Sequence, residues 1–313
     1  MDFKYIFGPV RSSRLGLSLG LELLGDKICD FDCLYCEVGK TLVHTMQRDA
    51  YVPAAEILRE LEEWFELGYN SPDFITLGGM GEPCLNSEMG MVIHGVKKMR
   101  PDIPVAVLTN SSLLSQPEVR RELNLADAVL PSLDTVVEKE FQLLNRPCSG
   151  ILLKDILDGL IEFRKEFGGN IYLEILLVAG FNDSKDNLYG LKEFCRRLSP
   201  ERIDLTRMTR PGAYIKAPKV DPELESQWRK VLDIGGPVRK SADNQILNEF
   251  ELEVDQETVL ASLRRRPQTV EQLASALGTS PDAIQKIVKE LLHSGQLSSN
   301  RDLGVDKNFF SVR

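Results

Sequence analysis

Three cysteines that lie close together are the residues of this chain best suited to chemistry. Cys29, Cys33 and Cys36 form the pattern C-x3-C-x2-C in the stretch KICDFDCLYCEVGK. Three thiolates with no fourth cysteine nearby suit a [4Fe-4S] cluster with three irons held by protein, whose fourth iron stays open to a ligand. The same thiolates together with His44 would make a Cys3His zinc site, so the spacing alone leaves both metals open.

A glycine-rich loop follows a short apolar segment further along the chain. Residues 73–77 are predicted to form a buried strand, and Gly78, Gly79 and Gly81 follow it, with Glu82 behind them. Glycines at the end of a strand let a ligand approach the backbone and leave its N–H and C=O groups free to bind. Taken alone, such a loop predicts only a turn.

Together, the cysteine motif and the GGMGEP loop resemble the radical S-adenosylmethionine (SAM) superfamily. The resemblance implies a partial (β/α)6 TIM-like barrel of α/β class, with a [4Fe-4S] cluster on the three cysteines and SAM as the second cofactor. It implies that the glycines and Glu82 hold the amino group of the methionine moiety, and that Tyr35 lies beside the adenine. It implies reductive cleavage of SAM to a 5′-deoxyadenosyl radical that abstracts hydrogen from a substrate, and it makes zinc the minor alternative.

The elements that would position these motifs alternate between strand-like and helix-like segments over residues 1–235, which predicts β/α units and a parallel sheet. The expected strands are 17–24, 74–77, 105–108, 128–130, 171–178 and 202–205. The expected helices are 54–67, 88–99, 136–144, 154–167 and 187–198.

Polar side chains recur at the ends of these strands, where such barrels gather their chemistry. Asn110 follows the third strand, Asp134 follows the fourth and Arg210 follows the sixth, whereas Glu174 lies inside the apolar fifth. The resemblance implies that Asn110 and Asp134 contact the ribose or the substrate, and it makes Glu174 and Arg210 further cofactor-binding candidates. Loop capping by Asn110 and Asp134, and a lumen-facing Glu174 without a ligand, are the structural alternatives.

Further arginines suit bidentate capture of a carboxylate or phosphate group. Arg11 and Arg14 flank two serines in the N-terminal segment, and Arg146 lies in the sequence LNRP. A solvated surface turn is the alternative for the N-terminal pair.

A narrower resemblance rests on FGPVRSSRLGLSLG, PSLDTVVEKEFQLLNRP, LEILLVAGFNDS and RMTRPGA. Over most of residues 5–215 the chain resembles iron–sulfur oxidoreductases related to wyosine-synthesising tRNA enzymes. The authentic wyosine synthases bind a second cluster through further N-terminal cysteines, and none precedes Cys29 here. Because Cys84, Cys148 and Cys195 are expected to be small packed residues, neither a second cluster nor wyosine synthesis itself is expected.

The C-terminal residues 253–313 predict a winged-helix domain, joined to the barrel by a linker over 236–252. Its expected elements are helices over 257–265, 269–277 (with Thr269 as N-cap) and 281–293, and a hairpin of 296–297 with 308–312. The domain carries as many acidic as basic residues, whereas the whole chain has a net charge of −9. Since nucleic-acid binders usually present a basic face, RNA and a partner protein both remain open as ligands of this domain.

The remaining expectations concern the cellular compartment, the electron donor and the substrate. The scattered cysteines do not form a disulfide framework, and we find no secretory signal and no membrane-spanning segment, which together indicate the cytoplasm. The radical chemistry calls for a one-electron reductant of flavodoxin or ferredoxin type. The substrate is expected to be a tRNA or RNA nucleoside. The alternatives are a small molecule or peptide, with the winged helix docking a partner, or a redox-sensing DNA-binding regulator.

Overall fold

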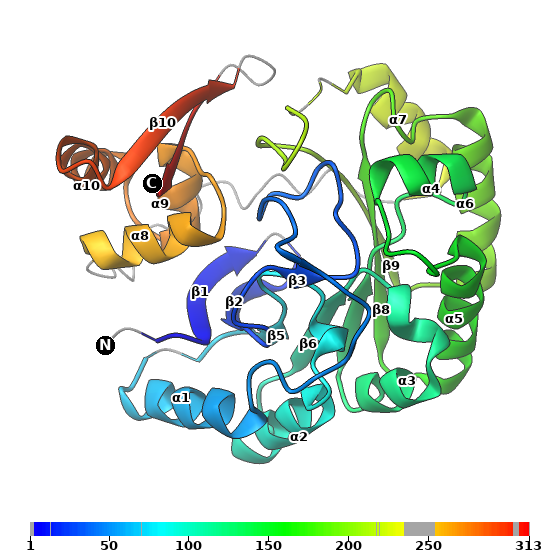
Figure 1. Ribbon diagram of the computed structural model, residues 1–313, viewed down its shortest axis with the longest axis horizontal. Coiled ribbons are helices and arrows are strands. Elements are labelled where there is room, and N and C mark those ends of the chain that lie inside the picture. The colour runs from blue at the N-terminus through cyan, green and yellow to red at the C-terminus, as the bar shows by residue number, and fades with distance from the viewer. Residues whose placement is uncertain are drawn as a thin grey trace.

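A curled sheet lies at the centre of the larger part of the protein, and helices cover its outer face (Figure 1). The computed structural model describes residues 3–12, 14–69, 71–216, 218, 220–234, 254–302 and 307–312. Within them the sheet has seven strands, in the order β1 (Ile6–Ser12), β2 (Gly16–Leu21), β5 (Phe74–Leu77), β6 (Val105–Thr109), β7 (Ala128–Pro131), β8 (Asn170–Leu177) and β9 (Arg202–Arg207). Strands β2 to β9 are parallel to their neighbours, and β1 pairs antiparallel with β2. This arrangement confirms the predicted partial barrel.

The helices between the strands bury one face against the sheet. They are α1 (Ala54–Glu66), α2 (Met89–Met99), α3 (Pro117–Leu123), α4 (Glu138–Leu144), α5 (Leu153–Glu166), α6 (Lys185–Leu198) and α7 (Pro222–Val231). In α1, Ile57, Leu61 and Trp64 recur at helical spacing and are at most 2% exposed. Burial of such side chains contributes about 1.5–3 kcal/mol each, which fixes the face that the helix turns inward.

One predicted boundary was wrong, and three elements of the barrel were not among those expected. The expected strand 17–24 ends at Leu21, because the chain then leaves the sheet to form the cysteine loop. Strand β1 was not expected, since Gly8 and Pro9 argue against a strand; it is an edge strand whose register shifts between Phe7 and Val10. Helices α3 and α7 were also missed, because both are short and largely polar.

The C-terminal residues form a separate small module beside β1 (Figure 1). It contains α8 (Gln256–Arg265), α9 (Val270–Leu277), α10 (Pro281–His293) and the hairpin of β10 (Leu297–Asp302) with β11 (Lys307–Val312), which surround their own apolar core. Thr269 caps α9 in a capping box with Gln272, as expected of its N-cap position. The three helices and the hairpin are thus confirmed, while the winged-helix assignment and the domain boundaries stay predictions. The predicted linker 236–252 lies outside the described residues.

No helix in the described ranges is long and apolar enough to cross a membrane.

Candidate active site

A cavity of about 240 Å³ opens at the C-terminal ends of the barrel strands, and all three motif cysteines line it. The cysteine loop starts after β2, and a short strand β3 (Ile28–Cys29) fixes its beginning by pairing with β4 (Val43–His44). The structure brings most predicted cofactor ligands to the same cavity. Those that line it are Tyr35, Gly78, Gly79, Gly81, Glu82, Asn110, Asp134 and Glu174.

The three cysteines are free thiols, of which Cys29 is buried and Cys33 and Cys36 are half-buried. Burial raises the pKa of the Cys29 and Cys33 thiols, so both favour the protonated form until a metal displaces the proton. Lys27 Nζ lies 3.2 Å from Cys36 Sγ. Burial by itself would lower the pKa of Lys27, but the thiolate charge of the neighbouring cysteines, Cys36 first, outweighs burial and raises the pKa, which keeps a cation beside the cysteines.

The donor set fits a cluster better than a single metal ion. Within the described part of the chain, no three His, Cys, Asp or Glu side chains lie together as a site for one ion. His44, the fourth ligand of the zinc alternative, does not line the cavity; its Nε2 lies 3.1 Å from the carbonyl oxygen of Asp30. Three thiols spaced around one cavity can instead each take a different iron of a cluster.

The glycine loop packs tightly against the cysteine loop. A Cβ atom on Gly81 would lie 1.7 Å from the carbonyl oxygen of Ile28, and one on Gly79, whose φ is +130°, would lie 2.1 Å from Glu22 Oε2. Side chains are therefore excluded at both positions, whereas Gly78 has room for one. The backbone of this loop reaches the cavity because the two glycines let the two loops touch.

Glu82 ties the glycine loop to the end of β6. Its carboxylate accepts hydrogen bonds from the backbone N–H of Cys84 at 3.1 Å, from Thr109 Oγ1 at 2.7 Å and from the backbone N–H of Asn110 at 2.6 Å. Burial, followed by the nearby Asp30 carboxylate, raises the pKa of Glu82 to about 7. Asn110 also donates to Asp30 Oδ1 at 2.7 Å, so it links the glycine loop to the cysteine loop.

A second network surrounds Asp134. Tyr35 Oη donates to Asp134 Oδ2 at 2.5 Å, Asn145 Nδ2 donates to the same oxygen at 3.0 Å, and the N–H of Leu176 donates to Oδ1 at 3.0 Å. Burial raises the pKa of Asp134 although these bonds oppose the effect. Asn145 Nδ2 also lies 3.8 Å from Cys33 Sγ. Asn145 was missed in the sequence, although it lies in the stretch LNRP, because only the neighbouring Arg146 was considered there.

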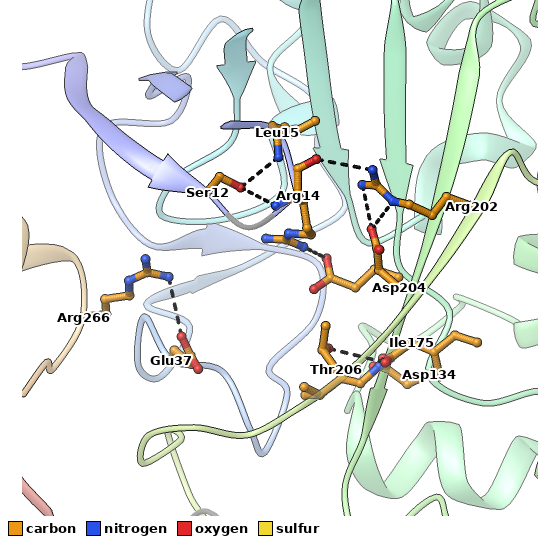
Figure 2. Close-up of polar contacts among 12 residues, drawn as sticks. Ser12, Arg14, Leu15, Glu37, Asp134, Ile175, Arg202, Asp204, Thr206 and Arg266 are labelled. Atoms are coloured by element: carbon orange, nitrogen blue, oxygen red, sulfur yellow. Dashed lines mark hydrogen bonds and ion pairs between the residues drawn. The ribbon is translucent and has the colours of Figure 1, made fainter. Parts of the chain in front are cut away.

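The ion-pair partner of Glu174 comes from the opposite edge of the sheet. Arg14, in the turn between β1 and β2, forms an ion pair with Glu174, and its carbonyl oxygen accepts from Arg202 Nη1 at 3.3 Å. Figure 2 shows this turn beside Arg202 and Asp204, which are themselves paired at 2.8 Å. Arg14 was expected to capture an anion, and the anion it meets is this carboxylate.

Arg210 does not line the cavity. Its Nε lies 3.2 Å from Glu37 Oε2, and Arg266 of the C-terminal module lies 3.6 Å from the same oxygen (Figure 2 shows the Arg266 contact). Burial lowers the pKa of Arg210 to about 10. Its assignment as a cofactor ligand stays a prediction that this placement does not favour.

The other cysteines are packed residues. Cys84 and Cys195 are buried, Cys148 is half-buried, and none of them lines the cavity. That they hold no second cluster stays a prediction.

The chain resembles known proteins in sequence and in fold. The sequence model of the Radical SAM superfamily matches residues 27–191. A protein named UPF0026 protein MJ1312, from Methanocaldococcus jannaschii, is 31% identical over 91% of this chain and 90% of its own length. A protein named GTPase Obg, from Brachyspira hyodysenteriae, is 32% identical over 94% of this chain, which spans 43% of that relative's length.

Among solved structures, a radical SAM methyltransferase from Sphaerobacter thermophilus matches with a TM-score of 0.52 at 18% identity. The match covers 69% of this chain and 63% of that protein. At this identity the likeness supports the fold and says nothing further about the reaction.

Proposed function

Because the chain belongs to the radical SAM superfamily and, within it, to the UPF0026 proteins, we propose that it modifies a nucleoside in tRNA or another RNA. It is a radical SAM enzyme, with a [4Fe-4S] cluster and SAM as its cofactors. When bound, these cofactors supply one-electron reductive cleavage of SAM and hydrogen abstraction from the substrate. The observation that carries the assignment is that three thiols and a glycine loop line one cavity.

The residues of the chain have separate roles in this proposal. Cys29, Cys33 and Cys36 would hold the cluster, and the loop of Gly78 to Glu82 would present backbone groups to the methionine end of SAM. Tyr35, Asn110, Asp134 and Glu174 provide the remaining polar groups of the cavity.

Apolar side chains complete the wall of the cavity. They are Phe31, Leu133, Phe141, Leu153 and Ile156. An apolar wall lowers the local dielectric constant and so strengthens each electrostatic contact made beside it.

The first experiment tests the chemistry without a substrate. The protein is reconstituted anaerobically with iron and sulfide, reduced with dithionite and given SAM, and 5′-deoxyadenosine is measured by chromatography. We expect product from the wild type and from a control variant Cys195→Ala, whose cysteine lies outside the cavity, and none from Cys33→Ala. Bound zinc in place of about four irons per chain would refute the assignment.

The RNA substrate is supported by the branch resemblance and by the C-terminal module. In the module, Lys286, Lys289 and His293 lie three or four residues apart on α10 and are exposed, so they share one face of that helix. This helix packs on α8, α9 and β10 of its own module. Such a face can contact phosphates even though the module as a whole is neutral.

Binding of tRNA as a function of salt tests this substrate class. Each lost phosphate contact should lower the slope of log K against log salt by roughly one unit, so Lys286→Ala/Lys289→Ala should lower it by up to about 2. The matched control is Lys154→Ala/Lys165→Ala, two exposed lysines on α5. Absence of tRNA binding at low salt would contradict the RNA proposal and leave the radical chemistry intact.

A second candidate is modification of a small molecule or peptide, with the module docking a partner protein. The equal numbers of acidic and basic residues in 253–313 favour it. A redox-sensing regulator is the weakest candidate, because a sensor has no need for a glycine loop beside its cluster.

A further inference from the structure

The outer surface of the cysteine loop carries an unusual group of exposed apolar side chains. Leu42 is 68% exposed, Val43 is 44% exposed and Met46 is 39% exposed, and Tyr214 beside the loop is 40% exposed. Tyr214 is joined to the loop, because its backbone N–H donates to the carbonyl of Leu34 at 3.1 Å and its hydroxyl donates to Asp32 at 2.6 Å. We name these four side chains the loop patch.

The loop patch lies directly behind the first cysteine. The N–H groups of Leu42 and Val43 donate to the carbonyl oxygen of Lys27 at 3.0 and 3.1 Å, and the N–H of Thr45 donates to the carbonyl oxygen of Cys29 at 3.1 Å. One backbone hydrogen bond therefore separates the exposed segment from the segment that carries the Cys29 thiol. The patch is outside the cavity, whose lining includes none of its four side chains.

The surroundings of the patch are cationic although the chain as a whole is acidic. Lys40 Nζ lies 5.0 Å and Arg146 Cζ lies 4.3 Å from the centre of the Tyr214 ring. Arg266 of the C-terminal module is 44% exposed and lies beside Glu37 of the loop, whereas Arg210, on the other side of Glu37, is buried. The exposed cations Lys40, Arg146 and Arg266 thus outnumber their two carboxylate partners, Asp32 and Glu37, in a chain of net charge −9.

We propose that the loop patch is the docking surface of the electron donor, a small acidic carrier protein of the flavodoxin type. The proposal rests on the radical SAM function, which needs one electron from outside. A substrate must enter the cavity to meet SAM, whereas an electron needs only to cross the loop that holds the cysteines. The loop patch lies behind the cysteines and outside the cavity, so it suits electron transfer and not substrate entry.

The choice of a flavin carrier follows from the chemistry of the surface. A flavin exposes the apolar edge of its ring, which suits contact with Leu42, Val43 and Tyr214, while an acidic protein around it suits the cationic rim of Lys40 and Arg146. The reaction is balanced by a single electron. The reduced flavin is oxidised by one electron, and the oxidised cluster is reduced by one.

Two variants separate docking from chemistry. Leu42→Glu places a negative charge in the patch, and its cost to folding is small because the side chain is largely exposed. Met91→Glu makes the same kind of change at a side chain of α2 that is 62% exposed, and serves as the matched control. Each reconstituted holoenzyme is titrated with purified flavodoxin, and cluster reduction is followed separately with reduced flavodoxin, reduced ferredoxin and dithionite.

We expect Leu42→Glu to weaken flavodoxin binding and to slow flavodoxin-driven reduction at least tenfold, while dithionite-driven formation of 5′-deoxyadenosine stays at the wild-type level. Met91→Glu should match the wild type in all three assays, and wild-type binding should weaken with added salt. The proposal is overturned if Leu42→Glu binds flavodoxin like the wild type, if only ferredoxin reduces the wild type, or if Leu42→Glu changes the oligomeric state instead. Absence of dithionite-driven product from the wild type would count against the radical function itself, so the two failures are distinguishable.

Discussion

Lys27 is expected to raise the reduction potential of the cluster, and Lys27→Met should lower it. The side chain is 7% exposed and its ammonium group lies 3.2 Å from Cys36 Sγ. The raised pKa of Lys27 keeps it charged at neutral pH. Reduction adds a negative charge to the cluster, so a fixed cation beside a ligand stabilises the reduced form more than the oxidised form.

The size of the effect follows from Coulomb's law. A cluster held by the three thiols would carry the added charge beyond Cys36 Sγ, which itself lies 3.2 Å from the ammonium group. A charge separation of roughly 6 Å and an effective dielectric constant of about 20 would then give about 3 kcal/mol. For a one-electron couple this corresponds to a shift of about 120 mV, and water in the open cavity reduces it to about 50–120 mV. Methionine keeps most of the volume of lysine, so the packing of the loop is preserved.

A redox titration followed by electron paramagnetic resonance measures this shift on reconstituted protein. The control is Lys40→Met, which removes an exposed charge from the same loop and should shift the potential by less than about 20 mV because solvent screens it. An unchanged potential in Lys27→Met would refute the reasoning. Formation of 5′-deoxyadenosine with a strong chemical reductant should persist in both variants.

Three further predictions concern stability, each measured by urea unfolding. Because the pKa of Glu82 rises from 4.5 unfolded to about 7 folded, the contribution of Glu82 to stability should be fully present below pH 4.5 and fall by up to about 3 kcal/mol as pH rises through 7, and Glu82→Gln should remove this contribution to the pH dependence. Asp134→Ala should lower the free energy of unfolding by about 3 kcal/mol, because the donors of Tyr35, Asn145 and Leu176 lose their acceptor. Asp134→Asn should lower it by less, and an equal loss in the two variants would contradict this account. Thr269→Ala removes the capping box of α9 and should destabilise the C-terminal module by about 1 kcal/mol, whereas exposed Ser299→Ala should leave it unchanged.

Strands β5, β6 and β7 were predictable because each is a largely buried apolar run, and β8 was predictable because apolar residues dominate it, whereas β9 has only one buried residue. Val105–Thr109 and Asn170–Leu177 differ from the expected segments by only one residue at one or both ends. Strand β1 was not predictable, since only pairing with β2 compensates for Gly8 and Pro9 at an edge. Helix α7 was not predicted, because Trp228 is its only buried side chain.

The candidate site likewise contains residues that the sequence predicts and residues that it does not. The cysteines and glycines are recognisable because their spacing along the chain carries the chemistry. The pairing of Arg14 with Glu174 joins residues 160 positions apart, and no local pattern encodes it. Arg210 follows a barrel strand but misses the cavity, because Gly212 packs on the backbone of Tyr35, where a Cβ atom would lie 2.7 Å away, and the chain passes outside the cysteine loop.

The contact between the C-terminal module and the cysteine loop is too weak to hold the two together. Arg266 is 44% exposed and lies 3.6 Å from Glu37, and a pair of this kind contributes at most about 1 kcal/mol. The module must therefore be held on β1 by the packing of α8 and α9, which lie against that strand. A partner that binds the exposed face of α10 leaves this packing untouched, because α10 packs on α8, α9 and β10 of its own module and the contacts with β1 come from α8 and α9. The proposed recognition at α10 and the proposed electron delivery at the loop patch would thus use different surfaces, and neither would have to disturb the cysteines.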